Sequence, residues 1–193
     1  MHPLAKYPFI IHFRGERAWL SNFFEGCPTL FAQRLWPTRE HLFQALKCAN
    51  LPNQYDLMEQ VRLAETPKQA KYLGRKIPLR PDWDFIQINA MLLCLGLFLI
   101  QYPEYQEKLA ATKGTVLVEG VWWNDAKWGQ PLNKQVIGLN LLGTLWMAIR
   151  DDIIPLHKIQ KLIELTELEY ACQRGISSPT NSPVIIGQSH FSF

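Results

Sequence analysis

Residues 81–103 have the sequence PDWDFIQINAMLLCLGLFLIQYP, and we expect the fold to be built around this segment. Its apolar run, Ala90 to Ile100, is far shorter than the roughly 20 residues that a membrane span needs. Pro81 and Asp82 are typical of a helix start, and Pro103 of its end. The segment therefore predicts a buried core helix, without a membrane as partner.

Further helices are predicted on both sides of this segment. Thr38 is a predicted N-cap for a helix that runs to about Ala49. Thr66 and Gln69 match a capping box, and Gly74 is predicted to end that helix. Three more helical patterns run from Pro103 to about Ala111, from Asn140 to Arg150, and from Pro155 to Arg174.

Short strands and loops fill the remaining sequence. Residues 9–31 are predicted as loops with short strands, and residues 115–121 as a strand rich in β-branched side chains. Residues 122–135 lack any period, and loops of this length are often functional. We predict a mainly α fold, with one compact domain over residues 1–152. Residues 153–193 add a helix at about 155–174 and a loose Ser/Pro-rich tail.

The composition is that of an ordinary globular protein. Hydrophobic residues make up 48% of the chain, which argues against a disordered protein. The net charge of +3 and a sequence pI near 8.7 argue against uniform polyanion binding, so nucleic-acid contacts would need local patches. Met1 to Lys6 lack the features of a signal peptide, which predicts a cytoplasmic protein.

The cysteines do not form a metal motif. Cys27, Cys48, Cys94 and Cys172 are widely spaced, without a CxxC pair or a Cys/His cluster. Reduced thiols are the simplest interpretation, and we expect neither a metal site nor a cofactor. The sequence also lacks a Walker loop, a GxGxxG motif and the patterns of nucleophilic hydrolases.

Tryptophans beside polar residues are the first candidates for a binding site. Trp83 lies between two aspartates, and Trp122, Trp123 and Trp128 share the irregular loop with Asp125. Aromatic faces beside carboxylates and amides can stack a nucleobase and hydrogen-bond to its edge. A tryptophan in the core is the alternative for each of them.

Glu40 is the strongest candidate for a functional carboxylate. It lies in the first turn of its helix, where it would share a face with Gln44 and Lys47. The N-terminus of that helix could also hold an anion such as phosphate. A carboxylate that only favours the helix dipole, on a solvated face, fits the same pattern.

A basic cluster follows around the end of the Thr66 helix. Lys71, Arg75, Lys76 and Arg80 could bind the phosphate of a nucleotide. Cations near a helix C-terminus are also stabilising by themselves, and a solvated cluster is the alternative.

Ordered motifs in the chain resemble those of the NADAR family, which includes the YbiA-like N-glycosidases. Over roughly residues 9–152 they are Leu20–Phe23, Trp36–Lys47, Ala64–Pro67, Leu73–Arg75, Leu79–Asp84, Met91, Leu117–Glu119, Asn124–Gly129, Gly138–Gly143, Met147 and Arg150. Four features depart from the family pattern, among them a loop about one residue longer after Glu119 and Gln130–Asn133 in place of a Gly-rich stretch. Arg39 stands where a serine is usual, adding a charge beside the site, and Phe98-Leu99 replace a Lys-Phe pair.

The resemblance implies a mainly helical enzyme that hydrolyses a bond between a ribosyl C1 and an exocyclic base amine. Two substrate classes occur in the family: ribosylamino-pyrimidine phosphates of riboflavin synthesis, and ADP-ribose attached to guanine, as nucleotide or in DNA or RNA. A binding module without turnover is the first alternative function. A helical interaction protein, whose partner docks from Ile154 onward, is the second.

The resemblance and the chemistry together give each candidate a role. Glu40 would stabilise positive charge at the ribosyl carbon and activate water. Asp125 or Glu119 would assist the leaving amine, and Lys47 is the covalent partner of an alternative imine path. The residues expected to bind the substrate are Trp83 and Trp128 by stacking, Asn22, Asn140 and Gln44 by hydrogen bonds, and Arg75 and Arg80 through phosphate.

Overall fold

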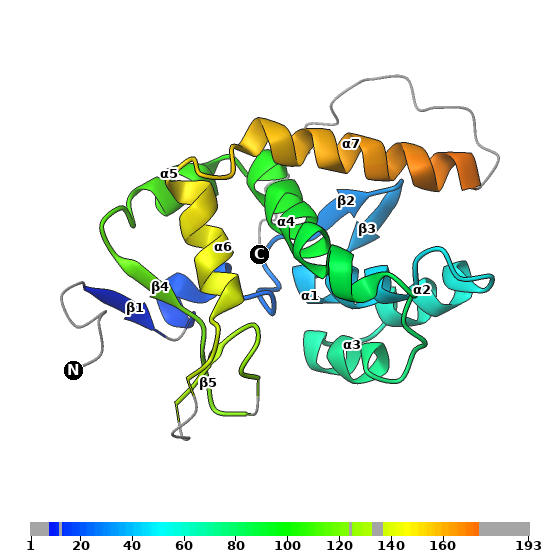
Figure 1. The fold of residues 1–193 in the computed structure, drawn as a ribbon, viewed down its shortest axis with the longest axis horizontal. Helices are drawn as coiled ribbons and strands as arrows, with labels where there is room; N and C mark the ends of the chain where they lie inside the picture. The colour runs from blue at the N-terminus through cyan, green and yellow to red at the C-terminus, as the bar shows by residue number, and fades with distance from the viewer. Residues whose placement is uncertain (1–7, 12, 124, 133–136, 174–193) are drawn as a thin grey trace, which may run out of the picture.

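Helix α4 (Trp83–Gln101) runs through the middle of this computed structural model (Figure 1). The structure describes residues 8–11, 13–123, 125–132 and 137–173. By length and composition the whole of α4 could cross a membrane, so the short apolar run by itself does not exclude a membrane span. The protein itself buries 67% of the apolar window of this helix, including Met91 and Leu95. Burial therefore identifies α4 as the core helix.

Short helices from the first half of the chain cover one side of α4. Their bounds are α1 Arg39–Ala45, the 3₁₀ helix η3 Leu46–Cys48, α2 Gln54–Arg62 and α3 Pro67–Gly74. Both predicted N-caps are present, since the Thr38 hydroxyl accepts from the His41 N–H and the Thr66 hydroxyl from the Gln69 N–H. Helix α1 packs against α2, α3 and α4, which makes it the most enclosed element on this side.

The other side of α4 holds the remaining short elements (Figure 1). Strands β1 (Phe9–Ile11) and β4 (Val116–Val118) pair in parallel, and so do β5 (Gly120–Val121) and β6 (Gln130–Pro131). Helix α6 (Leu141–Arg150) packs along β4 and against α5 (Glu104–Ala110). The 3₁₀ helix η2 spans Gly15–Leu20.

Helix α7 (Leu156–Gln173) lies across the outer face of α4. Gly96 makes this close approach possible, because a Cβ there would lie 2.3 Å from Ile159 Cγ2. The antiparallel pair β2 (Thr29–Phe31) and β3 (Arg34–Trp36) lies under α7, where Phe31 meets Tyr170 edge to face. The domain boundary expected after residue 152 stays a prediction, and the tail from residue 174 lies outside the described residues.

The mainly helical fold is confirmed, and several local predictions need correction. Residues 9–31 contain the helix η2 besides strands, and α2 had no predicted counterpart. The predicted irregular loop contains β6, which pairs with β5; Asn124 and residues 133–135 of that loop lie outside the described part. Gly74 is the last helical residue of α3, and its lack of a side chain admits Gln44, whose Oε1 would lie 2.1 Å from a Cβ.

Arg39 does not add a charge beside the pocket described below, as the sequence comparison had suggested. Its side chain is buried, and its Nη2 donates to the carbonyls of Trp19 and Ser21. The guanidinium carbon lies 4.1 Å from the centre of the Phe98 ring, and burial lowers the pKa of Arg39 to about 10. Two of the residues that depart from the family pattern, Arg39 and Phe98, therefore make one cation–π contact in the core.

Replacing Gly96 with valine should destabilise the protein, because the new side chain would overlap Ile159 and push α7 away from α4. We expect a loss of about 1–3 kcal/mol in the free energy of unfolding, measured by urea titration. Phe85→Ala, at a position of α4 that is 84% exposed, is the control and should change stability by less than about 0.5 kcal/mol. Equal effects of both changes would contradict this packing.

Candidate active site

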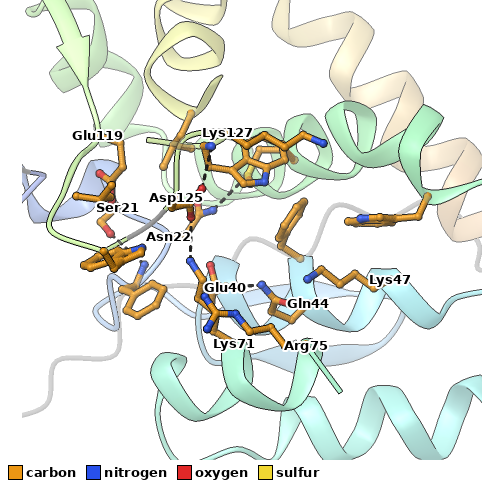
Figure 2. A pocket seen from close by; sticks show the side chains of 18 residues that line it. Ser21, Asn22, Glu40, Gln44, Lys47, Lys71, Arg75, Glu119, Asp125 and Lys127 are labelled. Atoms are coloured by element: carbon orange, nitrogen blue, oxygen red, sulfur yellow. Dashed lines mark hydrogen bonds and ion pairs between the residues drawn. The ribbon is translucent and has the colours of Figure 1, made fainter. Parts of the chain in front are cut away.

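A pocket of about 290 Å³ opens where α1 and α3 face the N-terminal half of α4 and the segment 119–128 (Figure 2). Its walls come from segments far apart in the sequence, so only the folded chain forms it. The side chains that line it are Ser21, Asn22, Phe23, Glu40, Phe43, Gln44, Lys47, Lys71, Arg75, Trp83, Met91, Glu119, Val121, Trp123, Asp125, Lys127, Trp128 and Leu142.

Glu40 lies in the wall of this pocket and away from bulk solvent. Its side chain is only 4% exposed, and its Oε1 accepts a hydrogen bond of 2.7 Å from Gln44 Nε2. Burial raises the pKa of the Glu40 carboxyl, while Lys71, the Gln44 hydrogen bond and Lys47 lower it in part. The pocket thus holds a carboxylate whose negative charge is poorly solvated and available to a cationic centre.

Lys71 connects the acidic groups of the pocket. Its Nζ lies 3.2 Å from Asp125 Oδ2 and 5.7 Å from the ring centres of both Phe23 and Trp123. The charge of Lys71 also lowers the pKa values of Glu40 and Glu119. The second oxygen of Asp125 accepts from the Trp128 N–H at 3.0 Å. Because both oxygens of Asp125 are engaged, it orients Lys71 and Trp128.

Glu119 is the second acid with a strongly altered environment. It follows β4, and its pKa is raised to about 7, mainly by burial; the negative charges of Asp125 and Glu40 add to this rise, while Lys71 and Arg14 oppose it. Its Oε2 is buried without a hydrogen-bond partner among the described residues. A carboxyl group that is partly protonated near neutral pH can donate or accept a proton during a reaction.

Aromatic side chains form one wall of the pocket. Phe43 lies between Trp83 and Trp128, with ring centres 5.4 Å and 5.2 Å away. Trp83 is buried, whereas Trp123 is 42% exposed at the rim, next to Trp122 at 53%. This wall can accept a flat heterocycle, and the exposed ring of Trp123 extends it outward.

Two lining residues carry amide oxygens that bear on ligand binding. Asn22 Oδ1 and Gln44 Oε1 are both buried without a partner among the described residues. Asn22 Nδ2 points to Met91 Sδ at 3.2 Å, which fixes the orientation of the amide. Buried polar atoms are rarely left unsatisfied. Gln44 Oε1 lies against Gly74 of α3, so the Asn22 oxygen is the better candidate to accept an N–H or O–H group of a substrate.

Cations line the pocket on the side of α3. Lys47 Nζ lies 3.4 Å from the carbonyl oxygen of Gly74, and burial lowers its pKa. Arg75 and Lys127 are exposed at the mouth. Arg80 does not line the pocket, since its guanidinium binds both oxygens of Asp82 at 2.6 Å and 2.9 Å.

The start of α1 is not an open anion site. The Glu40 N–H donates to the Asn22 carbonyl at 3.0 Å, and the His41 N–H to the Thr38 hydroxyl at 3.4 Å. These bonds use the N–H groups that would have to bind a phosphate. Within the described ranges, no cluster of three or more His, Cys, Asp or Glu side chains has the geometry to hold a metal ion.

Most of the predicted site residues line this one pocket: Glu40, Asp125, Glu119, Lys47, Asn22, Trp83, Trp128, Arg75 and Gln44. Asn140 lies outside the lining, with its side chain on the backbone of β4 and Glu119. Lys71, interpreted from sequence as part of a basic cluster near a helix end, is central to the pocket. Its spacing of four residues from Arg75, on the same helix face, was the available signal.

The comparisons with known proteins agree on one family. The family model described as "NADAR domain" matches residues 9–154. The N-glycosidase YbiA of Escherichia coli K12 is 34% identical over 132 residues, which cover 67% of this chain and 78% of that protein. The NMR structure of the E. coli protein YbiA superimposes with a TM-score of 0.64 at 32% identity, over 80% of this chain and 88% of that one.

A plant protein is similar over a smaller share of its length. The chloroplastic riboflavin biosynthesis protein PYRR of Zea mays is 32% identical over 131 residues, or 62% of this chain. The match spans only 20% of the maize protein. The similarity therefore concerns one part of that longer protein.

The raised pKa of Glu119 predicts how stability depends on pH. The folded carboxyl keeps its proton up to about pH 7, whereas the unfolded one loses it near 4.5, so stability is lost as the pH rises between these values. Glu119→Gln removes this loss, and the variant should gain up to about 2–3 kcal/mol over the wild type between pH 4.5 and pH 8. Urea unfolding at several pH values measures it; a constant difference would contradict a buried, protonated Glu119.

Proposed function

This chain belongs to the NADAR family, and on that premise we propose that it hydrolyses the N-glycosyl bond between a ribosyl C1 and an exocyclic base amine. The observation that carries the proposal is the burial of Glu40 against Lys71 and Gln44 beneath an aromatic wall. Such a site binds a flat base and offers a carboxylate to the carbon that becomes positive.

Glu40 supplies the negative charge in this mechanism. Departure of the amine leaves positive charge at the ribosyl carbon, and the poorly solvated carboxylate stabilises it. The same carboxylate accepts a proton from the water that attacks C1. The Gln44 hydrogen bond holds the Glu40 side chain in place, so that little reorganisation is needed as charge develops.

Glu119 supplies the proton for the leaving amine. With a pKa of about 7, this carboxyl is partly protonated at neutral pH. The C1–N bond breaks, the nitrogen takes the proton of Glu119, and water adds to C1 to give the free sugar. Asp125 is less suited to this step, because Lys71 and the Trp128 N–H occupy its two oxygens.

The remaining lining residues bind the substrate. Trp83 and Trp128 belong to the aromatic wall on which the base stacks, and the Asn22 oxygen accepts a hydrogen bond from the base or from the sugar. Arg75 at the mouth is the cation for a phosphate group.

Ribosylamino-pyrimidine phosphates are the first substrate class that we propose. The pocket volume suits a base with its sugar, and two of the similar proteins carry N-glycosidase or riboflavin biosynthesis in their names. ADP-ribose attached to guanine is the second class, because the exposed Trp123 extends the aromatic surface at the rim of the pocket. That substrate is a nucleotide or a guanine in DNA or RNA. The expected cytoplasmic location stays a prediction.

A direct assay with both substrates tests the function. The protein is incubated with a ribosylaminopyrimidine phosphate and, separately, with DNA that carries ADP-ribosylated guanine. Release of ribose 5-phosphate or of free ADP-ribose identifies the class. Tight binding without release would support the binding module, and neither binding nor release would favour the interaction protein. Borohydride added during turnover should trap no adduct; an adduct on Lys47 would support the imine path instead.

Glu40→Gln should lower kcat by about 10²–10⁴-fold, because a neutral amide cannot stabilise the charge at C1 or accept a proton from water. The KM should change little, since the amide fills the same space. The control is Glu107→Gln, an exposed position on α5, which should retain full activity. A folded Glu40→Gln protein with the wild-type rate would refute the role of this residue.

A further inference from the structure

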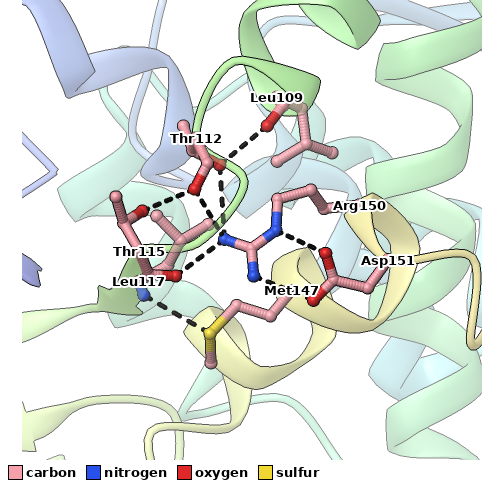
Figure 3. A network of polar contacts seen from close by, with 7 residues as sticks. All are labelled: Leu109, Thr112, Thr115, Leu117, Met147, Arg150 and Asp151. Atoms are coloured by element: carbon pink, nitrogen blue, oxygen red, sulfur yellow. Dashed lines mark hydrogen bonds and ion pairs between the residues drawn. The ribbon is translucent and has the colours of Figure 1, made fainter. Parts of the chain in front are cut away.

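Helix α6 is bonded to strand β4 and its flanking residues near both ends of the helix. At its C-terminal end, Arg150 Nη1 donates to the carbonyls of Thr112 and Thr115 at 3.0 Å and 2.8 Å, and the Leu117 N–H points to Met147 Sδ (Figure 3). This end lies away from the pocket lining. It fixes the helix alongside the strand.

At the other end of α6, Asn140 bonds to the strand directly beside Glu119. Its Nδ2 donates to the Leu117 carbonyl at 2.8 Å, and its Oδ1 accepts from the Glu119 N–H at 2.9 Å. Because an amide side chain carries a donor and an acceptor together, it can satisfy both backbone groups at once. The side chain thus completes the strand edge where β4 ends.

The backbone around Asn140 is shaped for this contact. Asn140 has φ 50° and ψ 41°, a left-handed conformation that asparagine tolerates better than most residues. Gly143 allows the helix to approach, since a Cβ there would lie 2.1 Å from the Leu117 carbonyl oxygen and 2.6 Å from Asn140 Nδ2. Both residues belong to the Gly138–Gly143 motif of the family resemblance, within which only Asn140 was expected to bind the substrate.

The group held by this contact is the backbone of Glu119. Its carboxyl faces charges from several elements, namely Lys71 of α3, Glu40 of α1, Asp125 and Arg14. Its Oε2 is buried and lacks a partner within the described part of the chain. Small shifts of this backbone would move the carboxyl toward Lys71 or toward water.

We propose that Asn140 is a positioning residue that acts through Glu119 and does not touch the substrate. The inference rests on the proposed function for its effect on turnover, but the position of Glu119 can be measured without any substrate. It also replaces the expectation that Asn140 hydrogen-bonds to the base or sugar.

Asn140→Gly is the main variant, because glycine keeps the left-handed backbone and removes only the two side-chain bonds. The Glu119 carboxyl resonance is assigned by its loss in Glu119→Gln and is then titrated by ¹³C NMR. Without these bonds the Glu119 carboxyl should become more solvated, and its pKa should fall from about 7 by at least one pH unit towards the ordinary 4.5.

Asn140→Asp is the matched variant. Aspartate still accepts from the Glu119 N–H but cannot donate to the Leu117 carbonyl, so only the bond to Glu119 remains, and its negative charge should raise the pKa of Glu119. A merely structural role for Asn140 would move the pKa in the same direction in both variants. Arg150→Gln is the control at the far end of α6 and should lower stability while leaving the pKa of Glu119 unchanged.

Turnover gives the second readout. Asn140→Gly should lower kcat at least tenfold with little change in KM, whereas loss of a substrate contact would raise KM. In a Glu119→Gln background the same change should have no further effect on kcat, since the group it positions is absent.

An unchanged pKa of Glu119 in a folded Asn140→Gly protein would overturn the proposal, and so would a raised KM with normal kcat. If Asn140→Gly does not fold, the test is the pKa of Glu119 in Asn140→Asp. A pKa that is unchanged or lowered in that variant overturns the proposal. Absence of turnover by the wild type on either substrate would count against the proposed function alone, because the NMR titration still reports on the positioning of Glu119.

Discussion

The ammonium group of Lys71 pairs with Asp125 and acts electrostatically on Glu40 and Glu119 in the same pocket, and the chemistry of the site depends on this arrangement. Buried acids that lack a cation would all take up protons. Lys71 pairs directly with Asp125 and lowers the pKa values of the other two acids, whose burial acts in the opposite direction. The acids therefore differ: Glu119 titrates near pH 7, whereas Asp125 is engaged at both oxygens.

The walls of the pocket come from two parts of the fold, and different contacts stabilise each part. Helices α1 and α3 carry Glu40 and Lys71, and α1 packs directly on α4. The opposite wall carries Glu119, whose backbone is bonded to Asn140 at the start of α6. Arg39 stabilises the segment between these parts, because its buried guanidinium binds the carbonyls of Trp19 and Ser21. The arrangement of the site thus depends on buried contacts well outside its lining.

Local signals in the sequence were sufficient for much of the fold. The N-caps at Thr38 and Thr66 and the apolar run in α4 depend on neighbouring residues, so their helices were predicted. Helix α2 was missed because none of its signals is strong: Asn53 makes no side-chain cap bond. Residue types and spacing also indicated most of the candidate residues, and the family resemblance added Asn22, Glu119 and Asn140; the roles of all of them in a reaction remain proposals.

The sequence by itself determined that a buried helix organises a mainly helical domain and that Glu40 begins a helix beside polar partners. Only the tertiary structure decided which charges meet. Lys71 lies in the pocket because α3 packs on α1. Arg80 lies outside it and binds Asp82, and Asn140 binds the backbone of β4. Helical periodicity assigns side chains to faces of one helix. It contains no information on the distance between residues of separate elements, and that distance sets every interaction energy in the site.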